Sequence, residues 1–157
     1  MIGAETGENY AVELLHGLPL HPLFGCFLLV SGQQDDSITQ FTDMPKSLDS
    51  EQIHGLFFAM QIDAQTSRVL SFVVDAKQQR RGYGSRCWNL FTSSAGASGL
   101  QWVQLEVRSD NQDAIRFYER RGLSTNGKIK GFYHGDDGML MSGPLKLPTV
   151  EVNRNQQ

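Results

Sequence analysis

The sequence reads QRRGYGS at residues 79–85, directly after the apolar run VLSFVVDA at residues 69–76. A short run rich in β-branched residues predicts a buried strand, and the closely spaced glycines behind it predict a tight turn into a helix. The first backbone N–H groups of a helix have no partner within the helix, and they carry a partial positive charge. A loop that joins a strand to a helix start is therefore a candidate anion site.

Four residues of this loop suit a phosphate group. Gly82 and Gly84 let the backbone take positive φ and approach a ligand without a Cβ atom in the way. Arg80 and Arg81 add positive charge beside them, and a pyrophosphate is the natural occupant. Taken alone, the loop is equally compatible with a packing turn. It is not a Walker loop, since no Gly-Lys-Ser/Thr follows, and Cys87 stands where a dinucleotide fingerprint has its third glycine.

The length and composition are typical of one globular domain. The chain has 157 residues, of which 39% are hydrophobic and 20% are charged. We expect a single domain over residues 1–157, with loose tails at 1–9 and 148–157. A net charge of -3 argues against a nucleic-acid binder, and no apolar run approaches the roughly 18 to 20 residues of a membrane span. The N-terminal residues lack the features of a secretory signal, so we expect a cytoplasmic protein.

The metal-binding residue types are scattered. The chain has four histidines and two cysteines, and none of them stands at the spacing of a zinc site. Cys26 and Cys87 lie far apart in the sequence and predict two free thiols. We therefore expect no metal.

The order of the expected elements indicates a mixed α/β or α+β domain around one sheet. A turn of sequence HGDD joins the last two strands. We expect strands over residues 24–31, 53–63, 68–75, 101–107, 128–133 and 138–145, and helices over residues 10–17, 84–94 and 112–121.

A second motif, LEVRSDNQDAIRFYERRGL at residues 105–123, follows an expected strand and opens an expected helix. Together with QRRGYGS it resembles the GNAT superfamily of acetyl-CoA-dependent N-acetyltransferases. Within that superfamily it is most similar to the ribosomal-protein and other protein N-terminal acetyltransferases, and the closing stretch at residues 129–145 is similar to theirs. The resemblance covers residues 69–145. It implies a single central, mostly antiparallel sheet flanked by helices, with a shortened or divergent N-terminal region.

The resemblance also implies roles for individual residues. Glu106 matches the general base and Tyr118 the general acid, and Phe132 with Tyr133 matches the aromatic pair, which we expect to line a peptide groove. Contacts to acetyl-CoA are implied for Phe72, Val73, Val74, Gln79, Arg80, Arg81, Gly82, Tyr83, Gly84, Ser85 and Asn111.

Simpler structural roles stay open for the same residues. Tyr118 could be a core aromatic, Glu106 a solvent-facing strand residue and Asn111 a helix cap. Arg116, Arg120 and Arg121 fit a solvated helix face, and Asp136 with Asp137 fits a turn.

The predicted function is transfer of acetyl from acetyl-CoA to a primary amine, most readily a protein or peptide α-amine. A small-molecule amine such as a polyamine, an amino acid or an antibiotic is the alternative acceptor. A non-catalytic acyl-CoA binding module is the further alternative, since only about 22 residues precede the first expected strand. The residues leave the oligomeric state open between monomer and homodimer.

Overall fold

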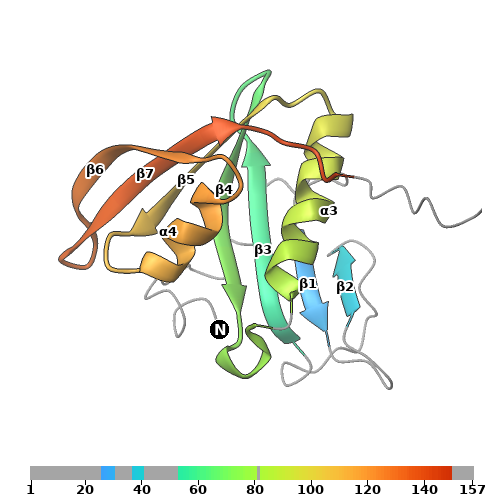
Figure 1. Cartoon of the computed structure of the whole chain (residues 1–157), viewed down its shortest axis with the longest axis horizontal. Helices are drawn as coiled ribbons and strands as arrows, with labels where there is room; N and C mark the ends of the chain where they lie inside the picture. The colour runs from blue at the N-terminus through green and yellow to red at the C-terminus, as the bar shows by residue number, and fades with distance from the viewer. Residues whose placement is uncertain (1–25, 31–36, 41–52, 81, 150–157) are drawn as a thin grey trace, which may run out of the picture.

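The computed structural model describes residues 26–30, 37–40, 53–80 and 82–149. Their strands form one seven-stranded sheet in the order β2-β1-β3-β4-β5-β7-β6, and helices α3 and α4 lie on one of its faces (Figure 1). The pair β4–β5 is parallel and the other neighbours are antiparallel. The elements are β1 (Cys26–Val30), β2 (Ser37–Gln40), β3 (Ile53–Gln61), β4 (Thr66–Val74), the 3-10 helix η3 (Ala76–Gln78), α3 (Tyr83–Ala97), β5 (Trp102–Arg108), α4 (Gln112–Glu119), β6 (Ser124–Tyr133) and β7 (Asp136–Pro144).

This arrangement confirms the expected α+β class with a mostly antiparallel sheet. All six expected strands and the two expected helices after residue 80 are present, with ends shifted by a few residues. Strand β2 was not expected from the sequence. The expected helix over residues 10–17, the tail at 1–9 and most of the tail at 148–157 lie outside the described residues. None of the helices in the described ranges is long and apolar enough to cross a membrane.

Strands β4 and β5 are paired with each other over only about half of their length. Their parallel pairing runs from Thr66 opposite Trp102 to Val69 opposite Leu105 and then stops. Strand β4 continues to Val74, paired only with β3 on its other side, and β5 continues to Arg108, paired only with β7. The two strands thus form a fork, and the inner backbone edge of β4 beyond Val69 has no strand partner in the described part of the chain.

The core fills the space between the sheet and the two helices. Alternate residues of β5, namely Val103, Leu105 and Val107, face this core, while the residues between them are less buried. Phe57 of β3 and Phe91 of α3 are fully buried, with ring centroids 4.9 Å apart. Burial of a side chain of this size stabilises the fold by about 1.5–3 kcal/mol. The core therefore fixes α3 and α4 against the sheet beside the fork.

Candidate active site

The loop after β4 turns into α3 through two residues with positive φ. Gly82 is the N-cap, with φ of 81°, and Arg80 has φ of 64°. No side chain caps the helix and its first turn has no acidic residue. The first helical hydrogen bond runs from the N–H of Arg86 to the carbonyl of Gly82, so the N–H groups before Arg86 have no acceptor within the helix. This confirms the strand, turn and helix start expected from the sequence.

Of the two properties expected of Gly84, the positive φ is contradicted, whereas the close approach to a phosphate stays a prediction. It lies within α3 and does not take positive φ. A Cβ atom at this position would stand 3.3 Å from Cε2 of Phe117 and 3.7 Å from Cζ of Phe72. Its lack of a side chain lets α4 approach the first turn of α3.

Two side-chain hydrogen bonds hold the loop in place. Nε2 of Gln79 donates to the carbonyl of Val74 at 2.8 Å, which closes the loop onto the end of β4. Nη2 of Arg121 donates to Oγ of Ser85 at 2.7 Å, and its guanidinium lies 3.4 Å from the centroid of the Phe117 ring. Burial lowers the pKa of Arg121. The expectation that Arg121 belongs to a solvated helix face is therefore wrong, because this side chain bridges α4 and α3.

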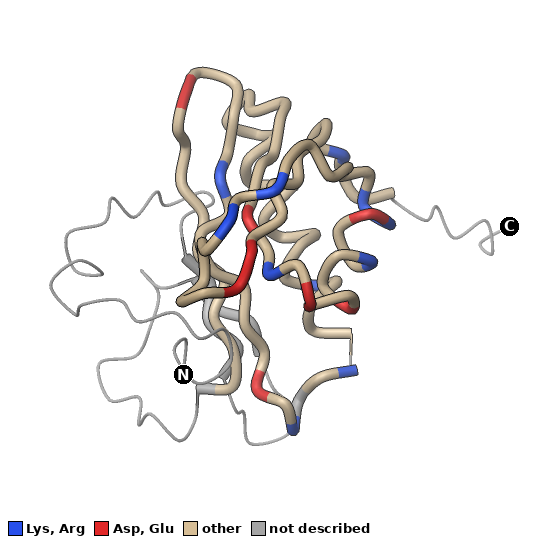
Figure 2. Tube along the Cα trace, turned by 90° about the vertical axis from the view of Figure 1, so that its left-hand side faces the viewer, with Lys and Arg blue, Asp and Glu red and all other residues tan. Residues whose placement is uncertain are grey.

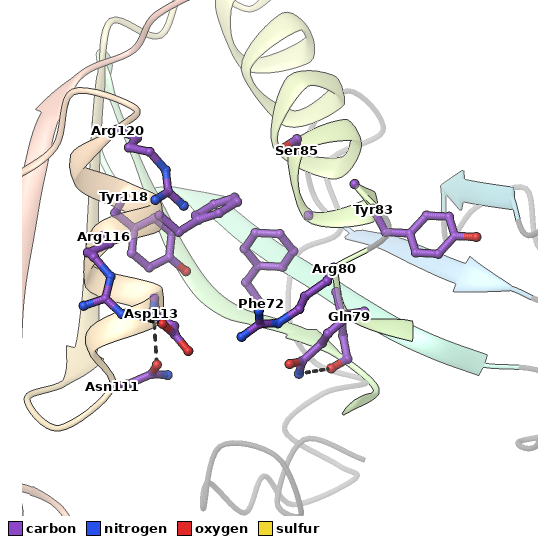
Figure 3. A pocket seen from close by; sticks show the side chains of 15 residues that line it. Phe72, Gln79, Arg80, Tyr83, Ser85, Asn111, Asp113, Arg116, Tyr118 and Arg120 are labelled. Atoms are coloured by element: carbon purple, nitrogen blue, oxygen red, sulfur yellow. Dashed lines mark hydrogen bonds and ion pairs between the residues drawn. The ribbon is translucent and has the colours of Figure 1, made fainter. Parts of the chain in front are cut away.

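A cavity of about 540 Å³ opens in front of this helix start (Figure 3). The side chains of Arg80 and Arg120 project toward it from opposite sides, whereas the ring of Tyr83 points away. The third arginine of the lining, Arg116, is paired with Asp113. Of the residues expected to contact a cofactor, those that line this cavity are Phe72, Val74, Gln79, Arg80, Gly82, Tyr83, Gly84, Ser85 and Asn111.

Two of the expected cofactor contacts differ from the rest. Val73 is buried and its side chain does not line the cavity, so only its backbone could serve a ligand from the inner edge of β4. Arg81 lies outside the described residues. The fit to coenzyme A otherwise rests on two backbone features: the first N–H groups of α3, which have no acceptor within the helix and could receive a pyrophosphate, and the open edge of β4, which could receive the amides of the pantetheine arm.

A second, narrower cavity of about 90 Å³ lies in the fork itself. Glu106 and Tyr133 line it together with Ser71, whose hydroxyl is buried without a hydrogen-bond partner among the described residues. The two cavities adjoin, because they have four lining residues in common, whereas Glu106 lines only the narrow one. The shared residues are Phe72, Asn111, Ala114 and Tyr118.

Glu106 is held by a neighbouring arginine. Nη2 of Arg68 lies 2.8 Å from Oε1 of Glu106, and Nε lies 3.2 Å from Oε2. The side chain of Glu106 is only 12% exposed. The reading of Glu106 as a plain solvent-facing residue is therefore wrong. Sequence reasoning did not identify Arg68, because its partner stands 38 residues away on another strand.

Tyr118 is buried on α4, and its hydroxyl points into the larger cavity (Figure 3). Its ring packs against Trp88 with centroids 5.6 Å apart. Burial raises the pKa of the phenol. The side chain is thus a core aromatic and also a protonated hydroxyl at the cavity wall, so both roles considered from the sequence fit its position.

Asn111 likewise has two possible roles. It is the N-cap of α4, and its Oδ1 accepts a hydrogen bond from the N–H of Ala114 at 3.1 Å. This confirms the capping role. It also lines both cavities, so a contact to a cofactor stays a prediction.

The aromatic pair sits near the turn of the β6–β7 hairpin. Tyr133 is buried and lines the narrow cavity, while Phe132 is 42% exposed and packs edge-on against Tyr133. Phe132 lines neither cavity, so its place in a peptide groove stays a prediction.

The two acidic residues after the turn are more than turn residues. Asp136 accepts a hydrogen bond from Arg108 at 2.7 Å, and Asp137 pairs with Lys128 at 2.8 Å. The hydrogen bond from Lys128 lowers the pKa of Asp137. Basic and acidic residues are interspersed in this way over the described part of the chain (Figure 2).

Within the described ranges, no group of three or more His, Cys, Asp or Glu side chains lies close enough to hold a metal ion. Cys87 is buried in α3.

The family model "Acetyltransferase (GNAT) family" matches residues 47–123, a range that contains the fork, the loop and α4. No curated protein gives a significant match. Among solved structures, Ard1 from Thermoplasma volcanium is 28% identical with a TM-score of 0.58, over 62% of this chain and 66% of that one, just under two thirds of its length.

Two further structures are alike in fold at lower identity. The ribosomal-protein-S18-alanine N-acetyltransferase from Escherichia coli is 17% identical with a TM-score of 0.64, over 96% of this chain and 88% of that chain. A chain of the NatC complex bound to Gag peptide and CoA is 16% identical with a TM-score of 0.70, over 92% and 86%. By its match to the family model, the part of the chain over residues 47–123 belongs to the GNAT acetyltransferase family.

Proposed function

We propose that this protein transfers the acetyl group of acetyl-CoA to the α-amine of a protein or peptide. The observation that carries the proposal is that Glu106 and Tyr118 line one narrow cavity in the fork, next to the larger cavity at the start of α3. A carboxylate and a protonated phenol are thus both within the space where the thioester and the amine would meet.

Each side chain has one role in this proposal. Glu106 takes a proton from the amine, directly or through a water molecule, as the amine nitrogen bonds to the acetyl carbonyl carbon. A backbone N–H near Val74 on the open edge of β4 donates to the carbonyl oxygen as negative charge develops there. Tyr118 gives its proton to the sulfur as the carbon–sulfur bond breaks, so the products are the N-acetyl amine and the free thiol of coenzyme A.

An α-amine suits a single carboxylate base better than a lysine does. A peptide α-amine has a pKa of about 7.7–8, whereas lysine lies near 10.4, so deprotonating lysine at the same pH takes about 3–4 kcal/mol more. Tyr133 at the narrow cavity, with Phe132 exposed beside it, offers an aromatic surface for a peptide. The Escherichia coli S18-alanine acetyltransferase and the peptide-bound NatC complex, which share the fold, support a protein acceptor.

Turnover of acetyl-CoA tests the proposal with three kinds of acceptor. The panel holds diverse short peptides with a free α-amine, the same peptides blocked at the N-terminus but carrying a lysine, and small amines such as spermidine and free amino acids. We expect thiol release with some free peptides and little with the other two groups. Equal or better turnover of spermidine than of every peptide would favour a small-molecule acceptor. Binding of acetyl-CoA without turnover of any acceptor would favour a non-catalytic module.

A further inference from the structure

We propose that Arg68 is a positioning residue for the reaction, which sets the carboxylate of Glu106 in the fork by holding both of its oxygens. This inference rests on the proposed role of Glu106 as the base. Nothing in the motifs of the sequence points to Arg68, and its assignment comes from its contacts alone.

The positions of Arg68 and Glu106 in the sheet determine the direction in which the arginine side chain extends. Arg68 on β4 stands opposite Gln104 on β5, so Glu106 is two residues further along, where the parallel pairing has just ended. The guanidinium therefore reaches forward along the strands and meets the carboxylate at the opening of the fork. Glu106 is fixed at the point where the strands separate and the narrow cavity begins.

The contact fixes orientation as well as position. Two parallel hydrogen bonds, 2.8 Å and 3.2 Å long, join the planar guanidinium to the planar carboxylate. Such a pair defines the plane of the carboxylate, which a single hydrogen bond from an ammonium group does not. A carboxylate has about four lone-pair sites, so each oxygen of Glu106 keeps a free one for an amine proton or a water molecule.

The arginine that lines the narrow cavity itself has other partners. Arg108 lines the same narrow cavity, but its Nη2 atom pairs with Asp110 at 3.0 Å and with Asp136 at 2.7 Å. Arg68 is 34% exposed and Glu106 only 12%, so water screens their pair less than it screens a surface pair. Without Arg68, the carboxylate would lose its two donors and turn to other rotamers.

Steady-state kinetics in two backgrounds tests the proposal. Arg68→Met should lower kcat about 10- to 100-fold, the order of loss expected when a reacting group is misplaced by about 1 Å. The affinity for acetyl-CoA should stay unchanged, because Arg68 does not line the larger cavity. Arg68→Lys, which keeps the charge but not the two coplanar N–H donors of the guanidinium, should recover only part of kcat. Lys130→Met, at an exposed position on β6, is the control for loss of one positive charge.

The decisive comparison uses Glu106→Gln as the background. If Arg68 acts through Glu106, adding Arg68→Met to Glu106→Gln should produce no further loss of kcat. An equal fold-loss in both backgrounds, or no loss in the wild-type background, would overturn the proposal. If Arg68→Met does not fold, Arg68→Lys is compared across the two backgrounds in the same way. Wild-type kcat in Glu106→Gln alone would instead reject Glu106 as the base, so the two failures are distinguishable.

Discussion

The ring of Phe117 lies 3.3 Å from the point where a Cβ atom would stand at Gly84, so α4 touches the first turn of α3 at this glycine. The hydrogen bond from Arg121 to Ser85 spans the same contact. The helix that presents Tyr118 is therefore packed directly onto the helix start that is the candidate anion site. A substitution at this contact should therefore disturb both the helix that carries Tyr118 and the start of α3.

Gly84→Val should weaken the binding of acetyl-CoA, because the added side chain must displace the Phe117 ring or the helix that carries it. Overpacking of this kind costs about 1–3 kcal/mol, which corresponds to about a 5- to 150-fold loss of affinity if it falls on the bound state. Calorimetric titration with acetyl-CoA measures the loss. Gly127→Val is the matched control, since a Cβ atom there meets nothing within 4 Å. Unchanged affinity in a folded Gly84→Val variant would refute the assignment of the loop.

Gly82→Val should act through the backbone instead. Gly82 has φ of 81° and open space around its missing Cβ atom, so the penalty is conformational and not steric contact with neighbours. A left-handed conformation costs an ordinary L residue about 1–2 kcal/mol, whereas asparagine tolerates it better. We therefore expect acetyl-CoA affinity to fall in the order glycine, asparagine, valine at this position. Equal affinity for the wild type and the two variants would show that the loop does not need this conformation to bind the ligand.

Arg80→Ala should weaken acetyl-CoA binding moderately, and the difference from wild type should shrink as salt is added. The side chain of Arg80 projects toward the larger cavity, where it would add a charge interaction to the backbone N–H groups (Figure 3). Arg116→Ala is the comparison, because Arg116 is already paired with Asp113 and should matter less. Titrations at low and high ionic strength check both variants. A salt-independent loss in Arg80→Ala would mean that the side chain shapes the loop and does not attract the phosphates.

Local patterns predicted most of the sheet, because alternation in β4 and β5 and the glycines around α3 are signals carried by neighbouring residues. Strand β2 was missed, since SITQ at Ser37–Gln40 has little apolar alternation and is defined by its pairing with β1. The fork was not predictable either. It depends on where the pairing of β4 with β5 ends, and partners so distant in sequence leave no local trace.

The same distinction between local and long-range contacts applies to the candidate site. Residues within one motif, such as Gly82 at the helix start and Asn111 as a cap, could be placed from their neighbours in the chain. The contacts of Glu106 with Arg68 and of Ser85 with Arg121 could not, because each joins two segments that meet only in the folded protein. Gly84 was given a backbone role for the same reason, since Phe117 is close to it only in space.

The buried phenol of Tyr118 should make the protein sensitive to alkali. Burial raises its pKa above the ordinary value of 10.0, so above about pH 10 the unfolded chain loses this proton while the folded protein keeps it. The contribution to stability is thus fully present below pH 10 and is lost as the pH rises further. Denaturant unfolding at a series of pH values should show a shallower alkaline decline in Tyr118→Phe than in wild type. Identical declines would mean that the phenol ionises as easily in the folded protein as in the unfolded chain.

Tyr118→Phe should also lower kcat while leaving the affinity for acetyl-CoA nearly intact. The substitution keeps the ring that packs on Trp88 and removes only the hydroxyl that points into the cavity. Proton transfer from a positioned side chain is worth about 100- to 10,000-fold in rate, so the loss should fall in this range where chemistry limits turnover. Because burial keeps the phenol protonated, the loss should be similar from neutral pH to about pH 9. Single-turnover kinetics with a saturating peptide measures the chemical step directly. A wild-type rate in this variant would leave Tyr118 with its packing role alone, and the proton for the departing thiolate would then have to come from another group or from water.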